Sequence, residues 1–188
     1  MIKRVPQRKR IYFGCEGDSE RSYGRLLNAL CDAAGLSLFL DCDVLQPGAG
    51  DPLALIETAV RHVREKSTKH GAFRACAVLL DRDKFGQSPD RDMRMFQLAS
   101  EHHIQLIWQF PCHEGLLLQH LEGPVGVRPA NPQLALRALK RSWPEYEKGM
   151  PATELASRID AGAVRRAADV DEGLRNFLRR IGFVNLRD

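Results

Sequence analysis

The chain has 188 residues, of which 44% are apolar and 28% are charged, a composition typical of globular proteins. No stretch approaches the ~18 consecutive apolar residues of a membrane span, and only a short apolar run follows the basic N-terminus. We therefore expect neither a membrane partner nor secretion. The five cysteines are scattered and include no C-x-x-C pair, which argues against a disulfide framework or a zinc ribbon and favours a cytoplasmic protein.

Charge is distributed unevenly along the chain. The first ten residues hold five basic side chains and no acid, whereas residues 11–122 hold 11 basic and 16 acidic side chains. Residues 123–188 are basic again, with 12 basic and 8 acidic side chains. Two interpretations remain open: ordinary solvated faces, or basic ends that hold a polyanion while the acids between them concentrate a metal ion.

Taken in chain order, strands alternate with helices over the first two thirds. Runs of β-forming or continuous apolar residues predict strands over 10–15, 36–45, 74–80 and 104–108. Capping residues followed by helical apolar spacing predict helices over 18–34, 51–70, 89–102 and 112–121. This alternation predicts an α/β fold, with a Rossmann-like parallel sheet flanked by helices.

The pattern changes near residue 123. Residues 123–132 are rich in glycine and proline without any period, which predicts a boundary loop. Helical spacing then predicts helices over 132–142, 151–160 and 171–181. We therefore expect an α/β core over residues 1–122 and a helical C-terminal extension over residues 123–188.

Acidic side chains follow two of the predicted strands. Glu16 and Glu20 come directly after the first strand, and Asp81 and Asp83 directly after the third. In an open α/β sheet, ligands bind outside the carboxyl ends of the strands, so both clusters lie where a site is expected. In extended backbone, Asp81 and Asp83 would point the same way.

Converging carboxylates repel one another unless a cation neutralises them, and hard oxygen ligands favour Mg²⁺ or Mn²⁺. Such an ion with open coordination positions is suited to phosphoryl chemistry. The other interpretation is that these acids are helix caps. We prefer that interpretation for Asp90 and Asp92, and we expect Asp41 and Asp43 to be solvent-facing strand residues.

Three stretches of the sequence carry a family resemblance. They are Glu16-Gly17-Asp18-Ser19-Glu20 with Tyr23, Leu80-Asp81-Arg82-Asp83-Lys84-Phe85, and Pro111-Cys112-His113-Glu114 with Leu117, Leu118 and His120. A strand ending in Glu-Gly and a later strand ending in D-x-D resemble the Toprim domain, and the three stretches together resemble the RloB-like abortive-infection family. The resemblance covers about residues 10–122.

The resemblance implies a Toprim fold and a metal-dependent nuclease of bacterial antiphage defence, gated by a partner ATPase. It implies that Glu16 is the catalytic or metal-binding glutamate and that Asp81 and Asp83 are metal ligands. Glu20 and Glu114 would be auxiliary acids at the same edge. The alternative is a non-catalytic Toprim scaffold or sensor that recruits a partner ATPase, since a fold does not determine a function.

Basic and aromatic side chains could complete a nucleic-acid surface. Arg82, Lys84 and Lys148 are the candidate contacts, and Trp143 and Tyr146 are either stacking platforms or residues packed under a loop. A homo-oligomer remains open. The scattered histidines match no zinc-ligand spacing, and the absence of G-x-x-x-x-G-K-[ST] excludes a P-loop ATPase within this chain.

Overall fold

The computed structural model describes residues 8–45 and 50–184, so the basic residues Lys3 and Arg4 lie outside the described residues. The strands are β1 (Lys9–Cys15), β2 (Leu38–Val44), β3 (Ala75–Asp81) and β4 (Ile104–Gln109). The helices are α1 (Asp18–Ala33), α2 (Pro52–His70), α3 (Pro89–Glu101), α4 (His113–His120), α5 (Pro132–Ser142), α6 (Ala152–Leu155), α7 (Ala161–Val170) and α8 (Glu172–Ile181). None of the described helices is long and apolar enough to cross a bilayer.

The four strands form one parallel sheet in the order β2-β1-β3-β4. Residues 75–80 of β3 are buried on both faces, as expected of a central strand covered by helices on each side. The predicted α/β fold with a parallel sheet flanked by helices is therefore confirmed.

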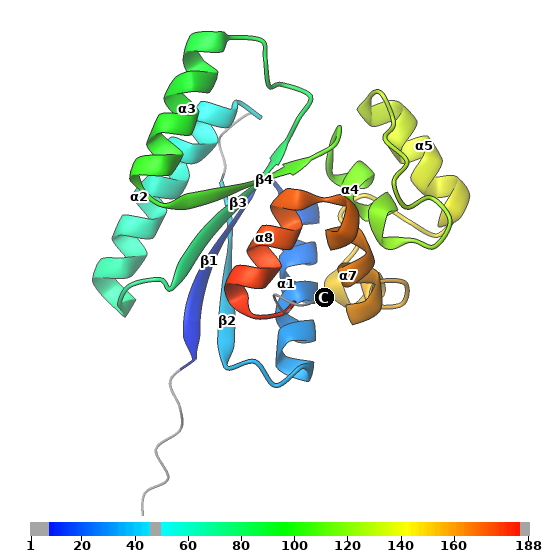
Figure 1. Cartoon of the computed structure of the whole chain (residues 1–188), viewed down its shortest axis with the longest axis horizontal. Coiled ribbons are helices and arrows are strands. Elements are labelled where there is room, and N and C mark those ends of the chain that lie inside the picture. The colour runs from blue at the N-terminus through cyan, green and yellow to red at the C-terminus, as the bar shows by residue number, and fades with distance from the viewer. Residues whose placement is uncertain (1–7, 46–49, 185–188) are drawn as a thin grey trace, which may run out of the picture.

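Helices cover both faces of the sheet (Figure 1). The helices α2 and α3 pack on one face, in a cluster that includes Ile56, Met95 and the strand residue Val78. The helices α1 and α8 pack on the other face, together with Phe13 and Ile107 of the sheet. The sheet is thus the middle layer of three.

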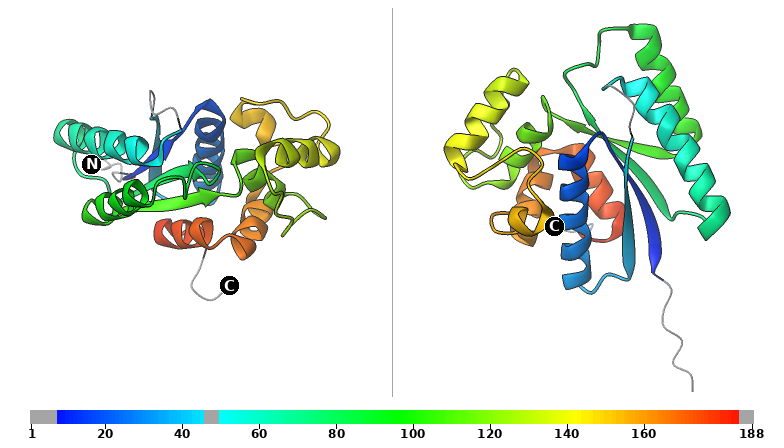
Figure 2. Two further views of the ribbon diagram at one scale, coloured as in Figure 1. Left: turned by 90° about the horizontal axis from the view of Figure 1, so that it is seen from above. Right: turned by 180° about the vertical axis from the view of Figure 1, so that it is seen from behind.

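Beyond residue 122, α8 packs against β3 and β4, α6 packs against α1, and α5 and α7 pack against α4 (Figure 2). The rings of Phe13 in β1 and Phe177 in α8 lie 5.2 Å apart between centroids. The helix α4 is buried along its whole length, enclosed by its neighbours α5 and α7. The C-terminal extension therefore supplies part of the hydrophobic core of the α/β layer.

The strand order creates a crevice between β1 and β3. After β1 the chain crosses to β2 through α1 on one face, and it returns to β3 through α2 on the other face. Such a reversal in strand order is the point at which ligands bind to open α/β sheets. Glu16 follows β1 and Asp81 ends β3, so both stand at this point.

Two sequence predictions are wrong in their details. The helix predicted over 151–160 is the single turn α6, and Asp160 begins a further helix, α7, by accepting a hydrogen bond from the Ala163 amide at 2.8 Å. Asp41 and Asp43 do not face solvent: both pair with Lys66 of α2, at 2.9 and 3.1 Å. Their strand face lies against α2, which places cations of that helix beside them.

Candidate functional site

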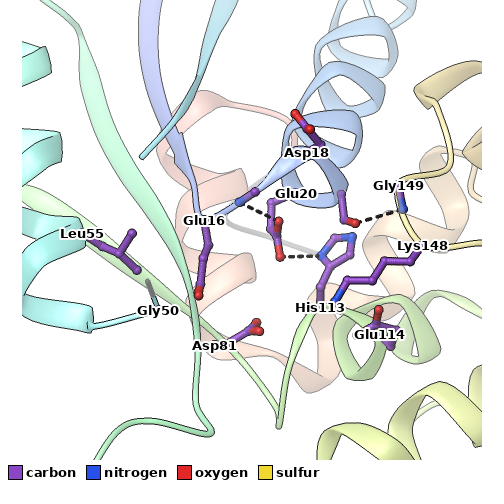
Figure 3. Close-up of a pocket in the computed structure, with 12 residues that line it drawn as sticks. Glu16, Asp18, Glu20, Gly50, Leu55, Asp81, His113, Glu114, Lys148 and Gly149 are labelled. Atoms are coloured by element: carbon purple, nitrogen blue, oxygen red, sulfur yellow. Dashed lines mark hydrogen bonds and ion pairs between the residues drawn. The ribbon is translucent and has the colours of Figure 1, made fainter. Parts of the chain in front are cut away.

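A pocket of about 620 Å³ opens at the crevice between β1 and β3 (Figure 3). The turn from β1 into α1, the start of α2 and the end of β3 form one side of it. The start of α4 and the loop after α5 form the other side, where Glu114 and Lys148 are found. Of the predicted site residues, the pocket brings together Glu16, Glu20, Asp81, Glu114 and Lys148.

Asp81 is a carboxylate of the pocket that is crowded by other negative charges. As the last residue of β3 it is partly buried, and its Oδ1 atom has no hydrogen-bond partner among the described residues. Burial, followed by the negative charges of Glu16 and Glu20, raises the pKa of Asp81 to about 9. A buried carboxylate oxygen that lacks a donor is destabilising unless a cation or a proton compensates it.

Glu16 faces Asp81 across the crevice (Figure 3). Burial raises the pKa of Glu16, and the carboxylate of Glu20 raises it further, while a hydrogen bond from the backbone of Asp81 and the charge of Lys84 oppose these effects. A Cβ atom at Gly50 would lie 2.9 Å from Glu16 Oε1. The close approach of backbone at Gly50 therefore confines the Glu16 carboxylate to the pocket.

Glu20 is in part a helix cap, the other interpretation that the sequence left open for these acids. Its Oε2 atom accepts a hydrogen bond from the Gly17 amide at 3.0 Å, which caps the first turn of α1. Its Oε1 atom lies 4.0 Å from His113 Nδ1 (Figure 3). Glu20 lines the pocket, but one of its oxygens is already engaged by the helix terminus.

Both oxygens of Glu114 are also engaged. The Cys112 thiol donates to Oε2 at 3.1 Å, and the Tyr146 hydroxyl donates to Oε1 at 3.5 Å. Burial raises the pKa of the Cys112 thiol to about 12, so this sulfur is a neutral donor and unsuited to nucleophilic catalysis. The two donors fix the Glu114 carboxylate beneath the pocket wall.

His113 is a pocket residue that the sequence analysis did not single out as part of the carboxylate site. It is 3% exposed, and its Nδ1 atom lies 2.7 Å from Gln109 Nε2, the amide at the end of β4. Burial lowers its pKa, which favours the neutral ring. The adjacent Cys112 and Glu114 drew attention to this stretch, but nothing local predicts that the imidazole faces Glu20.

The second aspartate of the D-x-D motif does not line the pocket. The strand ends at Asp81, and Asp83 lies exposed in the turn that follows, so the extended geometry expected for the pair is absent. Its charge still acts on Glu16 and Asp81, because it raises the pKa of both carboxyls. We therefore regard Asp83 as a peripheral acid of this site.

The three candidate nucleic-acid contacts lie in different places. Lys148 lines the pocket, and its loop is attached to α1 by a hydrogen bond from the Gly149 amide to Ser19 Oγ at 3.1 Å (Figure 3). Lys84 is exposed beside Glu16. The Arg82 guanidinium instead stacks on the Phe85 ring, 3.9 Å from its centroid, and does not line the pocket.

The remaining aromatic and histidine candidates are structural. Trp143 and Tyr146 are 2% and 1% exposed, so neither offers a ring for base stacking. His120 is fully buried between the Tyr23 hydroxyl and the Leu116 carbonyl, each 3.0 Å away. Within residues 8–45 and 50–184, no three His, Cys, Asp or Glu side chains are grouped as a metal centre would require. A zinc site, which needs three or four such ligands, does not fit this part of the chain.

Magnesium makes a smaller demand on the protein. It keeps several water molecules and is commonly bound by one or two carboxylates together with substrate phosphates. Asp81 and Glu16 provide two carboxylates that line one pocket, and the Oδ1 atom of Asp81, which has no hydrogen-bond partner within residues 8–45 and 50–184, provides a ligand. The residues present therefore fit a Mg²⁺ or Mn²⁺ ion that is completed by substrate and water.

Comparison of the chain with protein-family models, with curated proteins and with solved structures finds no match. The chemistry of the pocket must therefore be argued from its own residues.

Proposed function

We propose that the chain is a Mg²⁺- or Mn²⁺-dependent nuclease that hydrolyses phosphodiesters in nucleic acid. One observation carries this proposal: Asp81, whose buried Oδ1 atom has no hydrogen-bond donor among the described residues, shares a pocket with Glu16 at the point where the strand order reverses. Two carboxylates in that place destabilise the fold, because they repel each other until a cation or a proton is bound. Their presence is therefore better explained by binding than by stability.

The roles of the residues follow from their positions. Asp81 and Glu16 would hold the ion, and the ion would supply positive charge to a phosphodiester oxygen and an activated water. Lys148 stands on the opposite wall, where its ammonium group can bind a phosphate oxygen and stabilise charge that develops there. Glu114, held by Cys112 and Tyr146, keeps the wall beneath Lys148 in a fixed geometry.

The resemblance to the RloB-like family extends the proposal to a biological setting. In that setting the chain would be the effector of a bacterial antiphage system, and a partner ATPase would gate its cutting. The described residues supply the pocket and no ATPase motif, so nucleotide hydrolysis would belong to the partner.

A non-catalytic scaffold or sensor is the alternative. It is favoured by the structural use of two of the acids, since Glu20 caps α1 and Glu114 accepts hydrogen bonds on both oxygens without any metal. The two functions differ in what they require of Asp81. Only the nuclease needs a carboxylate there.

The deciding experiment incubates the purified chain with Mn²⁺ or Mg²⁺ and a panel of tRNA, single-stranded RNA, plasmid DNA and linear DNA. Wild type, Asp81→Asn and Glu16→Gln are compared with Asp169→Asn, which changes an exposed aspartate of α7. We expect cutting by wild type and Asp169→Asn, a loss of at least a hundredfold in both pocket variants, and full inhibition by EDTA.

Cutting that survives in Asp81→Asn would contradict the proposal. Absence of cutting by the wild type is followed by the same panel with the partner ATPase and ATP present. If the wild type is still inactive there, the scaffold function replaces the nuclease.

A further inference from the structure

A second pocket, of about 370 Å³, lies outside the carboxylate site at the end of β4. It is formed by the last residues of β4 on one side and by the turn between α7 and α8 on the other, two elements that lie side by side (Figure 1). We call it the β4 pocket. Its volume falls within the range of pockets that hold small organic groups.

One wall of the β4 pocket is aromatic and cationic. Phe110 is 38% exposed, and Trp108 lies two residues before it. The guanidinium groups of Arg128 and Arg82 lie 5.3 and 5.5 Å from the centroid of the Phe110 ring. An exposed ring flanked by two guanidinium groups is a surface on which another planar group can stack.

The opposite wall is polar and comes from α8. Asn176 and Glu172 are exposed there, so an amide and a carboxylate face the aromatic wall. Asparagine can donate to and accept from the edge of a base, and a carboxylate accepts hydrogen bonds from exocyclic amino groups. The carboxylate also disfavours a phosphate inside the pocket, so an anionic group would stay at the rim beside Arg128.

The β4 pocket adjoins the carboxylate pocket through the sheet. Gln109 pairs with Asp81 in the β3–β4 register, so Phe110 is the next residue beyond that pair. The Arg82 amide also donates to the Gln109 and Pro111 carbonyls, both at 3.0 Å, which ties the two strand ends together. Adjacent strands lie about 4.8 Å apart, so a bound chain that crosses Asp81 reaches Phe110 directly.

We propose that the β4 pocket binds an unpaired base of a single-stranded nucleic acid whose neighbouring phosphodiester lies at Asp81. The inference rests on the proposed nuclease function and deepens it, because it names the substrate class. A base held in a duplex keeps its faces stacked on its neighbours, whereas an unpaired base can insert beside Phe110. The guanidinium group of Arg128 lines the pocket, where it donates to the Val170 carbonyl at 2.5 Å, and its other N–H groups complement a phosphate next to that base.

The test measures binding in EDTA, where no cutting occurs, by fluorescence anisotropy of labelled oligonucleotides. The probes are ~12-nucleotide single strands and a blunt duplex of the same sequence, since sites of this kind span about 4–16 nucleotides. Phe110→Ala and Arg128→Gln are compared with Phe39→Ala and Arg64→Gln. The control Phe39 is 44% exposed on β2, and Arg64 is exposed on α2, both away from the β4 pocket.

We expect the wild type to bind the single strand more tightly than the duplex. Phe110→Ala should raise Kd for the single strand about tenfold, and Arg128→Gln should weaken binding and reduce its salt dependence. Both control variants should retain the wild-type Kd. Equal Kd values for Phe110→Ala and Phe39→Ala, or preference for the duplex, would overturn the inference.

Base binding in the β4 pocket and cutting at the carboxylate pocket are measured separately, so either proposal can fail without the other. Binding that depends on Phe110, without metal-dependent cutting, would support the β4 pocket and contradict the nuclease. Cutting that depends on Asp81 but is indifferent to Phe110 would support the nuclease and assign the aromatic wall to another occupant, such as a protein partner.

Discussion

Asp81 is a single residue whose position is costly to the stability of the fold. Its Oδ1 atom is buried without a hydrogen-bond partner among the residues that the structure describes, and burial and four other carboxylates raise its pKa. We predict that Asp81→Asn stabilises the metal-free protein by about 1 kcal/mol, because the amide keeps the shape of the side chain but needs neither the buried charge nor the bound proton that the raised pKa of Asp81 imposes on the fold. For a chain of this size, Tm should rise by roughly 2–4 °C.

The same thermal measurement distinguishes a metal ligand from a merely crowded acid. Added Mg²⁺ or Mn²⁺ should raise the Tm of the wild type and leave that of Asp81→Asn unchanged, since a ligand stabilises only the state that binds it. Asp169→Asn serves as the reference for nonspecific ion effects. An equal shift in all three proteins would argue against a cation held by Asp81.

His120 gives a second prediction at the scale of one residue. Its Nδ1–H group donates to the Leu116 carbonyl, which can only accept, so the neutral ring accepts from the Tyr23 hydroxyl at Nε2. Burial lowers its pKa to about 4. The unfolded chain, with an ordinary histidine pKa near 6.5, therefore binds the proton first as the pH falls.

The contribution of His120 to stability is complete above about pH 6.5 and is lost as the pH falls towards 4. In the wild type, the unfolding free energy should fall between about pH 6.5 and pH 4 partly because of His120. We predict that His120→Gln removes up to about 3 kcal/mol of this fall. Urea unfolding between pH 4 and pH 7 measures it, with the exposed His70→Gln as the matched control. Parallel curves for wild type and His120→Gln would contradict the assignment.

The sequence predicted the acids of the site better than their contacts. Glu16 and Asp81 were predictable because the carboxyl ends of parallel strands meet at one edge of the sheet. Asp83 was misplaced because the chain turns immediately after Asp81, and local sequence does not report where a strand ends to the nearest residue. Lys148 lies far along the chain from Glu16, so only the packing of its loop on α1 reveals that both face one pocket.

At the scale of elements, periodicity located the sheet and the helices around it but did not resolve α6 from α7. The helix predicted over 151–160 starts within one residue of the predicted position, but it ends after one turn. The buried face of α7 consists largely of alanines, such as Ala163, Ala167 and Ala168, which contribute little to an apolar pattern. The capping residue Asp160 was the available indication of a new helix.

The Asp160 cap gives the prediction for this element. Its carboxylate satisfies the Ala163 amide at the start of α7 and favours the positive end of the helix dipole. Asp160→Ala should lower the free energy of unfolding by about 1 kcal/mol, and Asp160→Ser should restore most of it. Urea unfolding of the three proteins measures both effects. Failure of serine to rescue would show that the carboxylate acts through something other than the cap.

For the whole molecule, the described residues do not support the hypothesis that the basic N-terminal end holds a polyanion against the acidic site. Of the basic N-terminal residues, the described Lys9 and Arg10 begin β1, at the end of the strand opposite the carboxylate pocket. Arg8 and Arg10 are also occupied, since they pair with Asp32 and Asp41 at 3.1 and 3.0 Å. Two cations lie near the pocket: Lys84 comes from the turn after β3, and Lys148 comes from the loop after α5.

The shared core makes a last prediction about the molecule as one cooperative unit. Phe177 in α8 is fully buried against Phe13 in β1, so Phe177→Ala should lower the unfolding free energy by about 3–5 kcal/mol. The two tryptophans report on the two parts of the chain, Trp108 in β4 and Trp143 directly after α5.

In single-tryptophan backgrounds, Trp143→Phe and Trp108→Phe, urea should produce coincident transitions, and Phe177→Ala should shift both midpoints equally. This coupling is expected because α8 covers the sheet face beside α1 and contributes to the same hydrophobic cluster. If the Trp143 transition moved while that of Trp108 stayed in place, the C-terminal helices would be an independently folding extension. Coincident shifts would mean that the carboxylate pocket folds only together with the C-terminal residues, which also supply Lys148 to its wall.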